Sequence, residues 1–377
     1  MTRDLASPID ILLPPRISFG AGMAAGVARW VRGRGLKRPL VVADSVNVAR
    51  VDRLGFEAGV PLYSGFHPEP DAADLATLLV AVRAAKPDVV IGFGGGSAMD
   101  LAKLAAVLLD SGQDFAEVVG ADKVASRRTA LVQVPTTAGT GSEVGTRALI
   151  TDPRTLNKLA VQSEYMLADL AVVDPELTVS MPRAVTVATG VDALAHCVEA
   201  YTNRLAHPLI DLYALEGIRL VGRWLPRAVA DGEDLQARAA MALAALYGGI
   251  CLGPVNTAGG HAVSYPLGSR HHIPHGAANA LIFPHVLAFN APVAVERTAT
   301  ILVALGLESA TTSEAVFATA WRWCAGLGCE MHLAAFGVGR DDLPRMADEA
   351  AAIRRLLDNN PRELTRADIL AIYHAAA

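Results

Sequence analysis

Carboxylate and imidazole groups in the second half of the chain are spaced so that they could bind a metal ion. The segment ATGVDALAHCVEAY places Asp192 and His196 four residues apart in a helical pattern, and Glu199 follows three residues later on the same side. A carboxylate and an imidazole on one helix face can hold a divalent cation, and a neighbouring acid can orient the histidine. An ordinary ion pair on a surface helix is the alternative.

A second segment, HAVSYPLGSRHHIPHG at residues 261–276, holds four of the ten histidines. Their spacing is too irregular for one amphipathic helix face. An imidazole can serve as a metal ligand, a proton shuttle or a core side chain, and this segment alone does not separate these roles. Because this segment lies in the same half of the chain, it favours the hypothesis that Asp192 and His196 bind a metal ion rather than form a surface ion pair.

A glycine-rich turn in the first half of the chain could bind an anion. In VVIGFGGGSAMDLAKLAA, a buried strand at residues 89–93 leads into the turn, and a helix starts near Ala98. The residues of the turn are Gly94, Gly95, Gly96 and Ser97. Such a turn lets the backbone approach pyrophosphate, and the start of a helix offers it unpaired N–H groups. A tight turn without a ligand is the alternative, because the dinucleotide fingerprint has glycine where Ser97 stands and an acid about 20 residues later.

Two other features that suit a dinucleotide follow neighbouring strands. Asp44 ends the strand in PLVVADS. In VPTTAGTGSEV, residues 134–144, small hydroxyl residues and glycines could contact a ribose, a phosphate or the nicotinamide amide. A solvated threonine–glycine loop is the alternative for this second motif.

The hydrophobic pattern predicts two domains that position these groups. Up to about residue 180, apolar runs alternate with alanine-rich helical patterns, as in RPLVVADS, PDVVIGFGGG, TALVQVPTT and LADLAVVDP. Runs that are apolar throughout predict parallel strands covered on both faces, in a doubly wound α/β layer. From SMPRAVTVATG onward only helical periodicity remains. We therefore predict an α/β N-terminal dinucleotide-binding domain at residues 1–181 and an all-α C-terminal, metal-binding domain at residues 182–377.

Composition and charge restrict the function classes. The chain has 377 residues and a net charge of −5, without a block of lysine or arginine, which argues against nucleic acid and membrane surfaces as partners. No apolar run approaches the roughly 20 residues needed to cross a bilayer, and the first residues show no secretory signal. The four cysteines lack CxxC spacing and are expected to be reduced thiols of a cytoplasmic enzyme: Cys197, Cys251, Cys324 and Cys329.

Taken together, the motifs resemble one enzyme family. The segments GFGGGSAMDLAK, VPTTAGTGSEV, GVDALAHCVEAY, IPHGAANALIFPHV and NPRELT occur in the order typical of the iron-containing (group III) alcohol dehydrogenases. The resemblance extends from ISFGAG to the end of the chain. It implies the dehydroquinate synthase-like architecture, in which an α/β dinucleotide-binding domain precedes a helical domain that carries the metal in the interdomain cleft. It also implies a homodimer.

The resemblance assigns site residues by matching position. It implies that the metal ligands are Asp192, His196, His261 and His275. It implies Fe(II), although a set of three histidines and one carboxylate is equally compatible with Zn(II). For NAD(H) it implies pyrophosphate at the glycine turn, contacts of the amide and ribose with Thr136, Thr137 and Thr140, and further contacts at Asp100 and Lys158. Asp44 matches the adenosine-ribose position, where a carboxylate accepts hydrogen bonds from a 2′-hydroxyl and repels a 2′-phosphate, so we expect NAD(H) rather than NADP(H).

One position departs from the family pattern. Many members carry a histidine that relays protons four residues after the third ligand, where this chain has Tyr265. A phenol titrates far less readily at pH 7 than an imidazole. Either Tyr265 orients the substrate while His271 or a water chain moves the proton, or the enzyme has no dedicated relay. For His272 a structural role and a place in the site are both open, and His285 is expected to be a structural histidine with its hydrogen bonds satisfied.

The expected reaction is NAD(H)-linked interconversion of a small alcohol and its aldehyde or ketone, with hydride passing directly between substrate carbon and nicotinamide. Arg147 follows the GTGSEV motif and could bind the carboxylate of an oxo acid, and Arg270 is a second candidate. The alternative is that Arg147 pairs with an acid such as Asp152 or faces solvent. A cyclising sugar-phosphate lyase of the dehydroquinate synthase type and a non-catalytic binding protein are the other functions considered.

Overall fold

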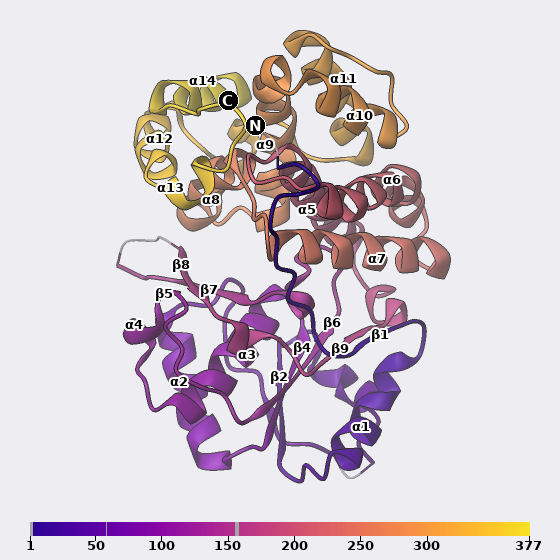
Figure 1. Ribbon diagram of the computed structural model, residues 1–377, viewed down its shortest axis with the longest axis vertical. Coiled ribbons are helices and arrows are strands. Elements are labelled where there is room, and N and C mark those ends of the chain that lie inside the picture. The colour runs from indigo at the N-terminus through magenta and orange to yellow at the C-terminus, as the bar shows by residue number, and fades with distance from the viewer. Residues whose placement is uncertain (1–2, 58, 155–157) are drawn as a thin grey trace. The chain divides into compact units, whose positions relative to one another are not determined.

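The computed structural model describes residues 3–57, 59–154 and 158–377, which form two compact units (Figure 1). One unit is Leu12–Val179, and the other combines Ser180–Ala377 with Met1–Ile11. The sequence analysis assigned residues 1–11 to the α/β domain instead. Their described part is held to the helical unit by hydrogen bonds: Arg3 N donates to Ala206 O at 3.0 Å, and Ser7 O lies 3.1 Å from His207 Nε2. Such a tertiary contact leaves no local pattern in the sequence.

The α/β unit contains a parallel six-stranded sheet in the order β1-β9-β6-β4-β2-β3. Its strands are β1 (Ile17–Phe19), β2 (Pro39–Ala43), β3 (Leu62–Tyr63), β4 (Val89–Gly94), β6 (Ala130–Pro135) and β9 (Leu170–Val173). The central strand β4 is buried at every position, as its uninterrupted apolar run predicts. The α/β fold class is therefore confirmed for this unit.

Helices cover both faces of this sheet. Successive residues of one strand point to opposite faces. Val42 therefore packs with α2 (Ala72–Ala85) and α3 (Gly96–Ser111), whereas Val41 packs with α1 (Val27–Gly33). This arrangement places the N-terminus of α3 directly after the carboxyl end of β4. In a doubly wound sheet, ligands bind at that edge.

A smaller three-stranded sheet lies in the same unit and was not predicted. It contains β5 (Gly120–Ala121), β8 (Lys158–Gln162) and β7 (Arg147–Thr151), in that order. β7 and β8 pair antiparallel, with Arg147 opposite Gln162. Ala148, Ile150 and Val161 join the core beside α3.

The second unit is helical, and no strand occurs among described residues 180–377. Its helices are α5 (Arg183–Thr202), α6 (Pro208–Ala230), α7 (Leu235–Leu252), α8 (Gly259–His271), α9 (His275–Asn290), α10 (Val295–Ala304), α11 (Ser313–Leu327), α12 (Leu343–Ala351), α13 (Arg354–Leu357) and α14 (Arg366–Ala376). α5 is buried along most of its length and packs against α6, α7 and α9 (Figure 1). The predicted all-α fold of this half is confirmed.

One helix in the described part of the chain, α7, is long and apolar enough to cross a membrane by length and composition. However, 61% of that segment is buried inside the helical unit, as in the core helix of a globular fold. The four cysteines form no disulfide bond, in agreement with the expected free thiols.

Candidate functional site

Three helices bring the predicted metal ligands to one point. Asp192 and His196 lie one turn apart on the buried helix α5. His261 lies in the first turn of α8, and His275 is the first residue of α9. α8 ends where His272 adopts a left-handed conformation (φ 54°), and α9 begins after Pro274, which favours the first turn of a helix and fixes the direction of the chain there.

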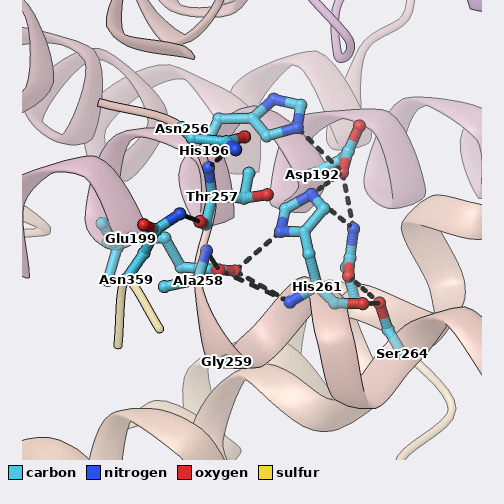
Figure 2. Close-up of polar contacts among 12 residues, drawn as sticks. Asp192, His196, Glu199, Asn256, Thr257, Ala258, Gly259, His261, Ser264 and Asn359 are labelled. Carbon is cyan, nitrogen blue, oxygen red and sulfur yellow. Dashed lines mark hydrogen bonds and ion pairs between the residues drawn. The ribbon is translucent and has the colours of Figure 1, made fainter. Parts of the chain in front are cut away.

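The donor atoms converge on one oxygen of Asp192. Its Oδ1 lies 3.5 Å from Nε2 of His261, 3.5 Å from Nε2 of His275 and 3.8 Å from Nε2 of His196. The imidazole rings of His196 and His261 stack at 4.7 Å, and Figure 2 shows both directed at Asp192. His275 is the most exposed of the four, with 35% of its side chain accessible. The donor atoms of Asp192, His261 and His275 lie within 4.8 Å of one another, so they could hold a divalent metal ion. His196 lies at the edge of this group, 3.8 Å from Asp192, and a small molecule could approach from the side of His275.

Charge in this cluster also suits a metal. Burial opposes ionisation of Asp192, but the imidazoles of His196, His275 and His261 outweigh it and hold the pKa of this carboxyl well below its usual range. Burial lowers the pKa of His196 to about 4, assisted by His261 and His275. Asp192 is therefore ionised and His196 is neutral, the forms that a divalent metal requires. Burial opposes a charge on His261, but Glu199 and Asp192 raise its pKa well above the usual value, so binding of a metal there would release a proton.

Glu199 orients His261. Its Oε1 accepts a hydrogen bond from Nδ1 of His261 at 2.7 Å and from the backbone N of the same residue at 3.2 Å, while Oε2 accepts one from Ala258 N (Figure 2). With Nδ1 engaged in this way, Nε2 of His261 faces Asp192. The sequence analysis expected an orienting acid at Glu199. The structure places it on the histidine of α8 and not on His196 of its own helix.

Asn279 lies among the ligand atoms and was missed by the sequence analysis. Its Nδ2 is 2.7 Å from Asp192 Oδ1 and 3.2 Å from Nε2 of both His261 and His275. Its Oδ1 lies 2.5 Å from the hydroxyl of Ser264. An ionised carboxylate accepts hydrogen bonds only, so the amide NH₂ faces Asp192. The available signal was its position one helical turn after His275.

Asn279→Ala is expected to weaken metal affinity about 10- to 100-fold, because groups that orient metal ligands contribute that much. Asp192 would lose a donor that fixes its carboxylate. Metal titration of the chelator-treated protein measures the change. Asn290→Ala is the control, since the side chain of this buried asparagine of the same helix bonds, among the described residues, with Asn360 and not with the cluster. Unchanged affinity in Asn279→Ala would remove the positioning role.

The two predicted catalytic side chains, Tyr265 for orienting the substrate and His271 for moving the proton, lie in different surroundings. The ring of Tyr265 is 5.8 Å from that of His275 and 6.4 Å from that of His261. His271 is ten residues further along α8 than His261, or about 15 Å at the rise of an α-helix. Its Nε2 lies 3.8 Å from Asp342 Oδ2. The structure thus places Tyr265 beside two rings of the cluster, whereas His271 lies far along α8 from His261 and near Asp342.

The expectation that His285 has satisfied hydrogen bonds is wrong. Its Nε2 is buried without a hydrogen-bond partner among the described residues. The ring packs 4.8 Å from that of Phe317. Burial and the nearby His332 lower the pKa of His285 to about 4, so it remains a neutral core side chain.

In the α/β unit, the predicted dinucleotide residues gather at the carboxyl ends of β2, β4 and β6. β4 extends to Gly94 and α3 starts at Gly96, so the turn is tighter than the sequence suggested. A Cβ atom on Gly94 would lie 2.6 Å from Asp44 Oδ2, and one on Gly96 would lie 3.0 Å from Thr140 Cγ2. These glycines therefore admit no side chain without displacement of a neighbour.

The threonine loop packs against the same turn. A Cβ atom on Gly95 would lie 3.6 Å from Thr137. Asn47 connects this loop to Asp44, because its Nδ2 donates to both carboxylate oxygens of Asp44 and to Thr136 Oγ1 at 3.0 Å. The structure thus brings Asp44 and the threonine loop to the glycine turn.

Three other predicted cofactor residues have partners within the protein. Ser97 Oγ accepts a hydrogen bond from Glu69 N at 3.2 Å. Lys158 Nζ contacts Glu69 Oε2 and Thr151 Oγ1, each at 2.9 Å. Asp100 accepts from Ser142 Oγ at 2.7 Å and from Leu149 N at 2.9 Å. Burial raises the pKa of Asp100. Its Oδ2 attaches the strand β7 to α3, and its Oδ1 attaches Ser142 in the segment before β7.

The two arginines predicted to bind an anion are engaged elsewhere. Arg147 Nε donates to Gln162 Oε1 at 2.7 Å, across the β7–β8 pair. Arg270 forms a two-bond ion pair with Glu349, so its charge is balanced within the helical unit. Arg270 is therefore not a free anion contact. Its partner lies 79 residues away in the sequence, so no local pattern could show this pairing.

Comparison with known proteins agrees with this geometry. Family models for iron-containing alcohol dehydrogenase and for the C-terminal part of the Fe-containing alcohol dehydrogenase family match residues 14–175 and 186–377. Long-chain-alcohol dehydrogenase 1 of Geobacillus thermodenitrificans (strain NG80-2) is 38% identical over 383 residues, covering 97% of this chain and 96% of the relative.

Solved structures share the whole fold. The crystal structure of a 1,3-propanediol oxidoreductase has a TM-score of 0.93 at 32% identity and covers 98% of this chain and 100% of that one. Sulfoacetaldehyde reductase from Bifidobacterium kashiwanohense, solved in complex with NAD+, has a TM-score of 0.89 at 27% identity over 99% of both chains. The fold and both family matches extend over nearly all of the sequence, so the resemblance noted from the motifs is confirmed: the chain belongs to the iron-containing alcohol dehydrogenase family and is an oxidoreductase of the alcohol dehydrogenase type.

Proposed function

We propose that this protein interconverts a small alcohol and its aldehyde or ketone with NAD(H), using a metal ion held by Asp192, His196, His261 and His275. The observation that carries the proposal is the convergence of three imidazole nitrogens on one oxygen of Asp192. The relatives named for alcohol and aldehyde substrates, and the neighbour solved with NAD+, support it. The family name favours iron, and nitrogen and oxygen donors also suit zinc.

The residues of the helical unit would prepare the substrate oxygen for reaction. A metal ion bound there would supply a Lewis acid to polarise that oxygen. Glu199 and Asn279 hold His261 and Asp192 in place. Tyr265, partly buried beside the rings of His261 and His275, is placed to orient the substrate and to carry a hydrogen-bonded proton near its oxygen.

The residues of the α/β unit would bind the dinucleotide. The backbone amides at the start of α3 would hold the pyrophosphate, and the side-chain-free surface of Gly94 and Gly96 allows close approach. Asp44 would accept hydrogen bonds from the 2′-hydroxyl of the adenosine ribose. Asn47 fixes that carboxylate.

The test is NADH oxidation by the Fe(II)-loaded protein with a panel of short aldehydes and oxo acids. The proposal predicts multiple turnovers, with one NADH consumed for each carbonyl group reduced. Binding of NADH without turnover on any of these compounds would instead indicate a binding protein. Conversion of a sugar phosphate without net NADH consumption would indicate a cyclising lyase.

A further inference from the structure

An arginine without an acidic partner lies beside the exposed edge of the predicted metal ligands. Arg355, on α13, places its guanidinium carbon 5.7 Å from the centre of the Tyr265 ring. The Tyr265 ring is in turn 5.8 Å from that of His275, the most exposed of the four ligands. The Tyr265 ring thus lies between the positive charge of Arg355 and His275, the side from which a substrate could reach the cluster.

The backbone that carries Arg355 is fixed to the helix that carries Tyr265. Asn359 Nδ2 donates to Thr257 O at 2.9 Å, just before α8 begins (Figure 2). It also donates to Arg355 O at 3.2 Å. The amide of Gly259, the first residue of α8, donates to Asn360 Oδ1 at 3.3 Å. These bonds join the segment after α13 to the start of α8, so the backbone of Arg355 is held near that of Tyr265.

The neighbouring arginines already have acidic partners. Arg354 forms an ion pair with Asp358, and Arg270 and Arg345 both contact Glu349. Across the three described ranges of the chain, no carboxylate lies within 4.0 Å of the Arg355 guanidinium, whose side chain is exposed. Its charge is therefore available to a ligand that arrives from solvent.

We infer that Arg355 binds the carboxylate of a short aldehyde acid while the aldehyde oxygen faces the Asp192–His275 cluster. The guanidinium is planar and matches a carboxylate with two parallel hydrogen bonds. Separations of 5.7 Å from the guanidinium carbon to the Tyr265 ring and 5.8 Å from that ring to His275 set an upper bound on the distance to be bridged. An aldehyde acid of three or four carbons, with a hydrogen bond at its carboxylate end, is short enough for it. This inference rests on the proposed function and names its substrate class as small anionic aldehydes and the hydroxy acids formed from them.

The reaction is a two-electron reduction. Hydride from NADH forms the new C–H bond at the carbonyl carbon, the carbonyl oxygen takes one proton, and NAD+ and the hydroxy acid leave. The carboxylate is unchanged and serves only for recognition. Arg355 therefore determines which substrate binds and takes no part in the transfer of hydride or proton.

Two substrates of the same chain length test the inference: 4-oxobutanoate and its uncharged methyl ester, each reduced with NADH. The wild-type protein is expected to favour the anion in kcat/KM by at least about tenfold, because a hydrogen-bonded charge contributes this much or more. Arg355→Gln should raise KM for 4-oxobutanoate about 10- to 100-fold and change KM for the ester less than about twofold. Arg355→Lys should recover part of the preference, since it keeps the charge without the planar fork.

Arg354→Gln is the matched control, because this adjacent guanidinium already pairs with Asp358 and should leave both substrates unaffected. Thermal unfolding of each variant verifies that the fold is intact. If Arg355→Gln changes both substrates equally, or if the wild-type protein reduces the ester as efficiently as the acid, the assignment of Arg355 is wrong while the proposed function stands. If neither aldehyde nor any other carbonyl compound of the panel consumes NADH, the proposed function itself fails.

Discussion

Replacing His275 with alanine should remove the bound metal ion and lower kcat/KM for aldehyde reduction by at least about 1000-fold. Lewis-acid stabilisation contributes several kcal/mol to the transition state, and each 1.4 kcal/mol corresponds to about a factor of ten. His275 is the most exposed of the four proposed ligands, so this change costs less packing than removal of the buried Asp192 would. Metal content per chain and NADH oxidation are measured on the same preparation.

His272→Asn is the control for this variant. His272 is exposed, three residues from His275, and has a left-handed backbone (φ 54°) that asparagine tolerates well. It should keep its metal and its activity. Wild-type metal content in His275→Ala would contradict the ligand assignment.

Replacing Asp44 with glycine should raise the ratio of kcat/KM with NADPH to kcat/KM with NADH by about 100-fold. The carboxylate lies at the glycine turn, where Asn47 holds it with hydrogen bonds of 2.8 and 2.9 Å. A hydrogen bond to a charged group contributes about 1.5–3 kcal/mol, which NADH would lose. A 2′-phosphate would at the same time escape repulsion by Asp44. Steady-state kinetics with both cofactors and one aldehyde gives the ratio.

Asp44→Asn separates the two effects, because it removes the negative charge and keeps a side chain of the same shape. It should improve the use of NADPH while retaining part of the activity with NADH. A wild-type protein that is more efficient with NADPH than with NADH would contradict the role given to Asp44.

The main elements of the fold could be predicted because they are encoded locally. The segment VVIGFG is apolar throughout, so it can only lie where both faces are covered, and it forms the central strand β4. In contrast, β7 (RALIT) and β8 (KLAVQ) mix charged and apolar residues. Their pairing with each other is stabilised by contacts with α3 that no short window of sequence contains.

The site was predictable only in part for the same reason. Asp192 and His196 share a helix face, so their spacing shows that they can act together. Nothing in the spacing of Arg270 indicates that Glu349 neutralises it. Asn279 is an amide on an apolar helix, and only the packing of α9 against α5 and α8 brings it to Asp192.

The central claim is that turnover with NAD(H) depends on the metal ion held by the Asp192 cluster. It is tested most directly by stripping the wild-type protein with a chelator, adding back Fe(II) or Zn(II) without oxygen, and measuring NADH oxidation with an aldehyde against the metal bound per chain. We predict that the stripped protein still binds NADH but does not turn over, and that activity returns in proportion to bound metal, to full extent at one ion per chain. Undiminished NADH oxidation by the metal-free protein would contradict this account.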